Sequence, residues 1–392
     1  MSRLLILPLI LFMLNACNNK QSEAPQKPSD EEVLKAINTA NDYFMNKFPD
    51  PGADLIQPVR SEGNDFSNGR IWQSNIWTFS TYATGLMTLY NTTNEQRHLD
   101  YLIDWGEKKN WTLPTEEMWN DHLAGQTYID LYKMDTTKNE YIEDVKTSID
   151  AYIAEGDTQG RRFGTDWNWI DAAYMAMPLF AQLGALTGDD VYYEKMHDLY
   201  LRMKNETGGG LYNPEDGLWW RDASFKPPHK EPNGENLYWS RGNGWVVGAL
   251  VRTLNYLPED APNREEYKGV LTEMFDALLK VQREDGLWNV SLHDPTNYGG
   301  KELTGSSFFI YGMAWGVNTG LIDAEKYAPA IYKGWNTLVE DCMHPNGFLG
   351  YVQGTGDEPS SGQPVTYTSM PDFEDFGLGM FLLAGTEVYK MD

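Results

Sequence analysis

A helical hairpin recurs along the chain, and this repeat constrains the fold more firmly than any single helix does. Each copy joins an apolar helix rich in small residues to an amphipathic helix through a short polar turn. The copies begin at Gly85, Tyr128, Phe180, Gly248 and Trp315. The repetition predicts an all-α architecture in which successive hairpins pack against one another.

The two helices of a hairpin differ in how much of their surface is apolar. Segments 171–184 and 306–320 are apolar nearly all round, as expected of helices that are buried on both sides. The second helices are apolar along one stripe only, so they belong on the outside. In one of them this stripe consists of Tyr267, Val270, Leu271, Met274, Leu278 and Val281.

The two ends of the chain complete the set of hairpins. Ser29 and Glu32 form a capping-box pattern that begins an outer helix, and segment 376–389 reads as a further inner helix. This gives about six outer and inner pairs, which predicts an (α/α)6 barrel. An open solenoid of similar hairpins would need polar capping repeats. Because the last helix is apolar, a closed ring is favoured.

The first residues have the order of an export signal. A positive start, Met1 to Arg3, precedes an apolar run too short to span a bilayer, and the run closes with Leu14-Asn15-Ala16-Cys17, which resembles a bacterial lipobox. We therefore expect residues 1–16 to be a lipoprotein signal peptide, Cys17 to be the site of lipid attachment and residues 17–30 to be a flexible tether. Residues 31–392 would then form a single catalytic domain, exported and anchored on the periplasmic side or the cell surface. An ordinary signal peptide is the alternative.

Charge and cysteine content exclude several classes of function. A net charge of −26 without a basic run disfavours nucleic-acid binding, and it leaves the lipid as the only expected contact with a membrane. Apart from Cys17 the chain has only Cys342, so no internal disulfide is expected. The histidines lack zinc spacing, and neither an EF-hand nor a GxSxG motif is present, so no metal or cofactor is predicted. The oligomeric state is left open.

Long aromatic loops are predicted to gather at one end of the barrel and to wall a single cleft. They are segments 161–169, 208–238 and 286–304. Asp171 follows the first loop, at the start of an apolar inner helix and behind Trp167 and Trp169. Poor solvation there raises the pKa of a carboxyl group and suits it to donate a proton. The alternative is an N-cap aspartate with no chemical role.

Asp121 has the same setting one repeat earlier, just before the apolar segment that follows it. Equivalent positions on neighbouring inner helices face the same cavity, so Asp121 and Asp171 are predicted to act as a catalytic pair. Two unrelated helix caps remain the alternative.

The run WSRGNGW supplies a candidate clamp for an acidic sugar. Arg241 has the planar fork that binds a carboxylate, and Trp239 and Trp245 have faces suited to stacking on a sugar ring. Arg221 is a second candidate of the same kind, and Trp169 is a further predicted substrate contact. The alternative for Arg241 is an arginine that satisfies backbone carbonyls.

From about Trp77 to the C-terminus the chain resembles glycoside hydrolase family 105, the unsaturated rhamnogalacturonyl hydrolases. The runs that carry this resemblance are YATGLMTLY from Tyr82, NDHLAGQTYIDLY from Asn120, WNWIDAAYMAMP from Trp167, GLWWRDASF from Gly217, WSRGNGW from Trp239, GLWNVSLHDP from Gly286 and ELTGSSFFIYGMAWGVNTGLID from Glu302. The resemblance implies an (α/α)6 barrel with Asp171 as the acid/base, Asp121 in the same site, and Arg241 and Trp245 touching the sugar. Some members have a histidine where this chain has Arg221, and this departure bears on the choice of substrate.

The implied substrate is an oligosaccharide with a 4,5-unsaturated uronic acid at its non-reducing end, left by a polysaccharide lyase. Asp171 would protonate C4, and water would add at C5. An ordinary inverting glycosidase on the same barrel is one alternative. A glycan-binding lipoprotein without catalysis is another. The source polysaccharide, the uronate epimer and the next sugar are left open.

Overall fold

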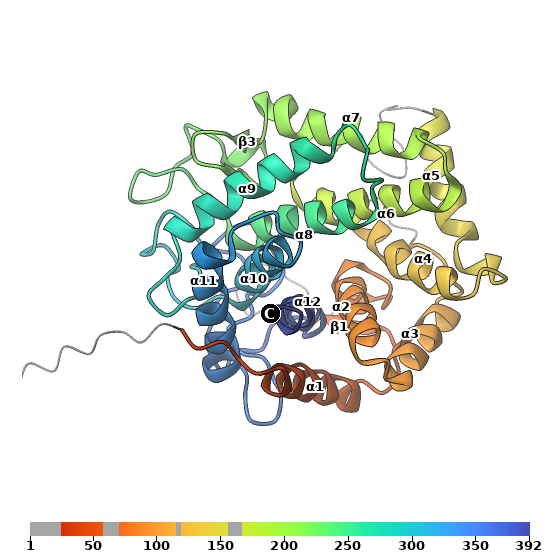
Figure 1. Ribbon diagram of the computed structural model, residues 1–392, viewed down its shortest axis with the longest axis horizontal. Coiled ribbons are helices and arrows are strands. Elements are labelled where there is room, and N and C mark those ends of the chain that lie inside the picture. The colour runs from red at the N-terminus through yellow and green to blue at the C-terminus, as the bar shows by residue number, and fades with distance from the viewer. Residues whose placement is uncertain (1–24, 58–69, 115–118, 156–166) are drawn as a thin grey trace, which may run out of the picture.

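The computed structural model describes residues 25–57, 70–114, 119–155 and 167–392. Within these residues twelve α-helices form an outer and an inner ring (Figure 1). The outer helices are α1 (Asp30–Lys47), α3 (Gln96–Lys108), α5 (Glu143–Glu155), α7 (Val191–Asn205), α9 (Arg264–Lys280) and α11 (Ala324–Thr337). The inner helices are α2 (Trp77–Thr93), α4 (Ala124–Met134), α6 (Asp171–Thr187), α8 (Ser240–Tyr256), α10 (Leu303–Asn318) and α12 (Asp375–Tyr389). The predicted six-hairpin barrel is confirmed.

The helix ends follow the sequence signals closely. Ser29 caps α1, and the side chain of Glu32 accepts the Ser29 backbone N–H at 2.9 Å, so the predicted capping box is present. The stripe residues from Tyr267 to Leu278 are buried on α9, whereas Val281 follows the helix and is partly buried. Helices α6 and α10 are buried on nearly every side. None of the helices in the described residues has the length and apolarity needed to cross a bilayer. Cys17 and the predicted signal peptide 1–16 lie outside the described residues.

The ring closes where α12 lies against α2, and two glycines make this contact possible. A Cβ atom on Gly379 would lie 2.3 Å from the carbonyl oxygen of Thr81, and one on Gly85 would lie 2.4 Å from the carbonyl oxygen of Gly379. No side chain fits at either position, because real Cβ atoms do not approach other atoms so closely. Backbone contact between the first and last inner helices therefore joins the ends of the repeat.

The inner helices begin at one end of the barrel, and the long loops meet there. The backbone N–H of Ile170 bonds to the carbonyl oxygen of Arg221, that of Ser240 to Val290 and that of Leu303 to Tyr351. Each loop is thus tied to the start of an inner helix that belongs to another hairpin. The predicted gathering of loops at one end is confirmed for their described parts.

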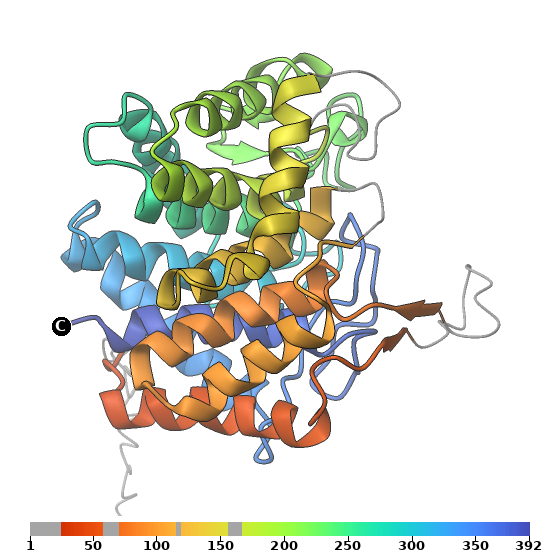
Figure 2. The same cartoon turned by 90° about the vertical axis from the view of Figure 1, so that its right-hand side faces the viewer.

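Short strands and short helical turns lie in the loops that connect the barrel helices. The antiparallel pair β1 (Leu55–Gln57) and β2 (Arg70–Trp72) stands out on the side of the molecule away from the C-terminus (Figure 2). A second pair joins β3 (Tyr212–Asn213) to β4 (Leu218–Trp219). The 3-10 helices are η1 (Trp119–Leu123), η2 (Asn139–Tyr141), η3 (Thr207–Gly209) and η4 (Ala223–Phe225), and η5 (Leu338–Cys342) is a π-helical turn.

Candidate active site

Asp171 is the first residue of α6 and is only 7% exposed. Arg221 reaches it from the loop after β4, with its Nε atom 3.3 Å from Oδ2 of Asp171. The backbone bond from Ile170 to Arg221 and the bridge between Trp169 and Asp222 hold this loop beside the start of α6. Two predicted site residues from different hairpins are therefore in contact.

Burial raises the pKa of Asp171, although the charges of Arg221 and then Arg241 act in the opposite direction. Removal from water disfavours the carboxylate, whereas a nearby guanidinium favours it. Since the effect of burial is the larger, the acid form of Asp171 persists to higher pH than that of an exposed aspartic acid. This is the property required of a carboxylic acid that donates a proton.

A comparison with Glu302 separates Asp171 from an ordinary helix cap. Glu302 caps α10, and its carboxylate accepts the backbone N–H groups of Thr304 at 2.8 Å and Gly305 at 2.7 Å. In the described part of the chain, no hydrogen bond reaches the buried Oδ2 of Asp171, and the Arg221 contact is an ion pair without hydrogen-bond alignment. Asp171 therefore does not cap the backbone of its helix, and its buried oxygen is paired with a guanidinium instead, which favours a functional role.

The start of α4 lies beside the start of α6. The indole N–H of Trp169 donates to Oδ1 of Asn120 at 3.3 Å, and Asn120 and Asp121 lie in η1, immediately before α4. Trp169 is partly exposed, as a substrate contact must be. The side chain of Asp121 falls outside what the structure describes, so its catalytic role stays a prediction.

Arg241 does not present a free fork for a sugar carboxylate. It is 1% exposed, and it donates from Nη1 to the carbonyl oxygen of Gln353 at 2.7 Å and from Nη2 to that of Gly354 at 2.9 Å. Its guanidinium lies over the rings of Trp239 and Phe376. These are the contacts of the alternative, an arginine that satisfies backbone carbonyls, and they hold the loop that precedes α12. Binding of a sugar carboxylate by Arg241 stays a prediction.

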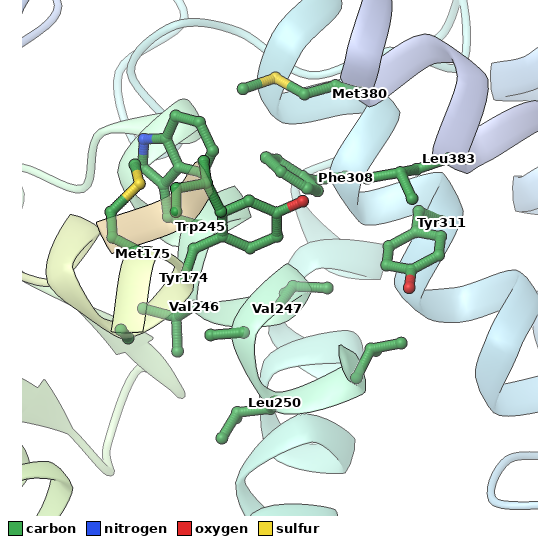
Figure 3. Close-up of a cluster of buried hydrophobic side chains, with 14 of the residues drawn as sticks. Tyr174, Met175, Trp245, Val246, Val247, Leu250, Phe308, Tyr311, Met380 and Leu383 are labelled. Carbon is green, nitrogen blue, oxygen red and sulfur yellow. The ribbon is translucent and has the colours of Figure 1, made fainter. Parts of the chain in front are cut away.

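The two tryptophans of the same run are also buried, and their predicted stacking on a sugar stays a prediction. Trp239 donates its indole N–H to Oε1 of Gln353 at 2.9 Å. Trp245 packs against Tyr174 and Phe308, each with ring centroids 5.1 Å away (Figure 3). Each residue is 1% exposed in the structure. Their aromatic surface stabilises the barrel interior.

A further carboxyl group, which the sequence reasoning missed, lies at the same end of the barrel. Asp375 is the first residue of α12, is buried, and precedes Phe376, the ring beneath Arg241. Burial raises its pKa to about 7, although a hydrogen bond from the Phe376 backbone acts in the opposite direction. An acidic residue at the start of an apolar inner helix was the signal that identified Asp171, and the same signal applies to Asp375.

The described residues contain no group of three histidine, cysteine, aspartate or glutamate side chains placed to hold a metal ion. The contacts seen here are those of a carboxylic acid beside a guanidinium. Such a site can carry out proton transfer on an acidic substrate.

Comparison with known proteins agrees with this arrangement. Residues 36–392 match the profile of Glycosyl Hydrolase Family 88. An unsaturated 3S-rhamnoglycuronyl hydrolase of Formosa agariphila is 34% identical over 332 residues, which cover 81% of this chain and 85% of that protein. A protein with the same description from an Alteromonas species is 26% identical, over 96% of this chain and 94% of its own length.

Solved structures give the same relationship. A glycosyl hydrolase family 88 protein of Bacteroides vulgatus superposes with a TM-score of 0.78 at 30% identity, covering 92% of this chain and 99% of its own. A possible member of family GH105 from Salmonella enterica shares the fold, with a TM-score of 0.71 at 21% identity over 97% of this chain and 99% of its own. The match to the family profile over nearly all of the folded chain is decisive: the protein is a glycoside hydrolase and belongs to glycosyl hydrolase family 88.

Proposed function

We propose that this hydrolase removes a terminal 4,5-unsaturated uronic acid from lyase-generated oligosaccharides by hydrating the C4=C5 double bond. The observation that carries the proposal is a buried carboxyl group with a raised pKa, Asp171, in contact with Arg221. The substrate requires both features, since its double bond must be protonated and its carboxylate must be bound. The names of the curated relatives support the same substrate class and suggest rhamnose as a neighbouring sugar to test first.

The reaction begins with proton transfer. The ring oxygen of the unsaturated uronate feeds electrons into the double bond, so C4 is basic and takes the proton of Asp171 while positive charge develops at C5. Water then adds at C5, and its proton returns to the ionised Asp171. The resulting hemiketal opens to a ketone at C5, and the hemiacetal left at C1 releases the remaining sugar without direct displacement at that carbon. We assign the positioning of the water to Asp121.

Arg221 also links substrate binding to the protonation of Asp171. Its Nη1 atom donates to Asp222 at 2.7 Å, and its Nε atom faces Asp171. A substrate carboxylate that binds Arg221 partly neutralises the guanidinium and so weakens its effect on Asp171. The pKa of Asp171 then rises further, because the opposing charge is reduced while the burial remains. Substrate binding would thereby favour the protonated acid that the first step needs.

Product analysis tests the reaction. A panel of lyase-generated oligosaccharides, including rhamnose-linked uronates, is incubated with the protein, and the ultraviolet absorbance of the conjugated double bond is followed together with the release of the shortened sugar. We expect the absorbance to fall in step with release. If the sugar is released while the chromophore persists, the protein is an ordinary glycosidase, and binding without turnover would identify a glycan-binding protein.

We also propose that Cys17 carries a lipid that anchors the hydrolase to a membrane, on the support of the Leu14 to Cys17 sequence. Incorporation of labelled palmitate and recovery in the membrane fraction test this proposal. Both are expected to be lost in Cys17→Ala and retained in Cys342→Ala. Labelling of Cys17→Ala equal to that of the unaltered protein would contradict it.

A further inference from the structure

A polar cavity lies at the opposite end of the barrel from Asp171, where the inner helices end. It has a volume of about 570 Å³, and its lining comes from the final turns of α2, α4, α8 and α12 together with α10. One lining residue, Arg252, lies eleven residues beyond Arg241 on the same helix, a separation of about 16 Å at 1.5 Å per residue. The cavity is therefore separate from the candidate active site.

The charges around this cavity are unbalanced. Arg252 and Lys133 share a single carboxylate, Asp130, with nitrogen to oxygen distances of 3.8 Å and 3.7 Å. Lys390 and Glu387 form a closer pair at 2.7 Å. Among the described lining residues, three cationic side chains therefore face two carboxylates, in a protein whose net charge is −26. This local excess of positive charge favours an anionic ligand.

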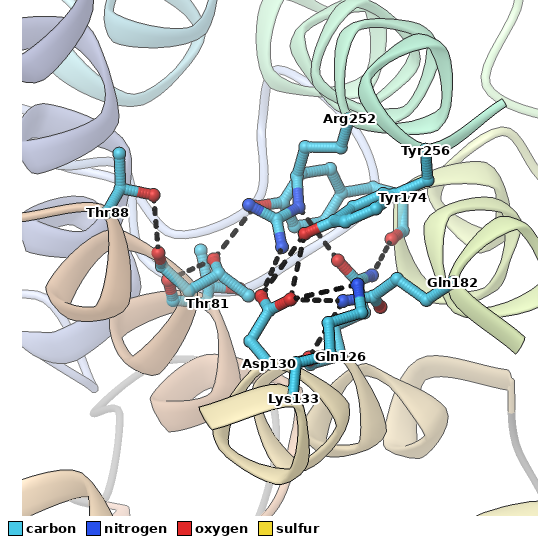
Figure 4. A network of polar contacts seen from close by, with 10 residues as sticks. Thr81, Thr88, Gln126, Asp130, Lys133, Tyr174, Gln182, Arg252 and Tyr256 are labelled. Carbon is cyan, nitrogen blue, oxygen red and sulfur yellow. Dashed lines mark hydrogen bonds and ion pairs between the residues drawn. The ribbon is translucent and has the colours of Figure 1, made fainter. Parts of the chain in front are cut away.

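Other groups already occupy Asp130, so it does not satisfy Arg252. The carboxylate accepts the Tyr256 hydroxyl at 3.0 Å and the Gln182 amide at 2.8 Å (Figure 4). Arg252 is 6% exposed and donates from Nε to Gln126 at 2.8 Å, but its buried Nη2 atom has no hydrogen-bond partner among the described residues. Among the described residues, the guanidinium of Arg252 thus has only the long contact with Asp130 as an ion pair, and an anionic oxygen in the cavity would add a second.

The remaining lining residues suit hydroxyl groups. Asn91, Asn255, Thr88 and Thr92 carry amides and hydroxyls. The Lys133 ammonium lies 4.2 Å from the centre of the Tyr256 ring, which helps to position it at the cavity. A cavity of this volume is within the range of small-molecule sites. We propose that it binds a small sugar acid, with the carboxylate at Arg252 and Lys133 and the ring hydroxyls at the asparagines and threonines. This site is independent of the reaction proposed above.

Trp315 provides a local signal for testing this site. Its indole N–H donates to Oδ1 of Asn255, a lining residue, at 2.9 Å. In the ¹⁵N-labelled full-length protein, the indole resonance is assigned with Trp315→Phe and followed during titration with glucuronate. We expect this resonance to shift in a saturable manner, and we expect the same shift in Arg221→Gln, whose active site is altered.

Lys133→Gln tests whether glucuronate binding requires the positive charge of Lys133. This side chain is partly exposed, so its replacement leaves the buried network around Asp130 in place. We expect it to weaken glucuronate binding about tenfold, as the loss of one charge-assisted hydrogen bond implies. Glucose, which lacks the carboxylate, should leave the Trp315 resonance unmoved, and inorganic sulfate should bind more weakly than glucuronate. An unmoved resonance with glucuronate, equal responses to glucose or sulfate, or unchanged affinity in Lys133→Gln would each overturn the proposal.

Discussion

Arg221 and Asp171 face each other with 3.3 Å between Nε and Oδ2, and this contact opposes the effect of burial on the pKa of Asp171. Burial raises the pKa of this carboxyl group and Arg221 lowers it. A change in the charge of Arg221 therefore alters the protonation of Asp171. In a site arranged in this way, the binding of an acidic substrate changes the fraction of Asp171 that is protonated.

Asp171→Asn should reduce kcat by about a thousandfold, because general acid catalysis contributes roughly 10²–10⁴ in rate and the amide cannot donate in the same way. The fold should persist, since asparagine has nearly the same shape. The rate of loss of substrate absorbance measures the effect on turnover, and circular dichroism measures the effect on the fold.

Glu302→Gln is the matched control, in which a capping carboxylate with two backbone donors is altered. It should cost about 1 kcal/mol of stability and leave turnover per folded molecule intact. Near-normal turnover in Asp171→Asn would rule out its role as the acid.

Arg221→Gln should move the basic limb of the pH profile of kcat/KM to higher pH. The reaction needs protonated Asp171, so activity falls as the pH rises through the pKa of this group. Removing the guanidinium removes an influence that lowers this pKa, so the limb shifts upward, while KM rises because a carboxylate contact is lost. Arg283→Gln, which breaks the pair with Asp285 instead, should leave the limb in place. A downward shift in Arg221→Gln would contradict this coupling.

The helices and their burial were predictable because the spacing of apolar residues indicates how many sides of a helix pack against other parts of the protein. Segment 171–184 is apolar all round and lies in the inner ring, and the stripe from Tyr267 faces inward on α9. The position of Asp171 was predictable for the same reason, since an acid at the start of such a helix has little access to water.

The contacts that Arg241 and Trp239 make with a distant loop could not be predicted in this way. Arg241 bonds to Gln353 and Gly354, which are more than one hundred residues away, and Trp239 bonds to Gln353 as well. Whether a side chain at the first turn of an inner helix faces the cleft or a covering loop depends on the path of that loop. No local pattern specifies this path, because packing between distant segments determines it.

Arg241→Lys distinguishes its observed role from the predicted one. Lysine cannot reproduce two parallel donors, so one carbonyl of the loop before α12 loses its partner. We expect the free energy of unfolding in urea to fall by about 2 kcal/mol, in line with hydrogen bonds to charged groups. If stability is unchanged and only KM rises, Arg241 is a substrate clamp after all.

Gly379→Ala should destabilise the barrel at the seam between its first and last inner helices. The added Cβ would lie 2.3 Å from the carbonyl oxygen of Thr81, and backbone atoms cannot move aside as a flexible side chain could. We expect a loss of about 3 kcal/mol or more, measured by urea unfolding. Gly269→Ala, on the exposed side of α9 with no atom within 4 Å, should instead be neutral or stabilising by up to about 1 kcal/mol. Equal effects of the two substitutions would mean that the seam is not closely packed.

Asp375 makes the stability of the protein depend on pH in a predictable direction. Its folded pKa of about 7 is above the ordinary value of 3.8, so between these values the folded state holds a proton that the unfolded state has released. Stability therefore falls as the pH rises from about 4 to about 7, by an amount on the order of a few kcal/mol, and then stays at the lower level. Asp375→Asn has no such proton to lose. Urea unfolding at pH 5 and pH 8 should thus show a smaller decrease in the variant than in the unaltered protein, and an equal decrease in both would assign the effect to another group.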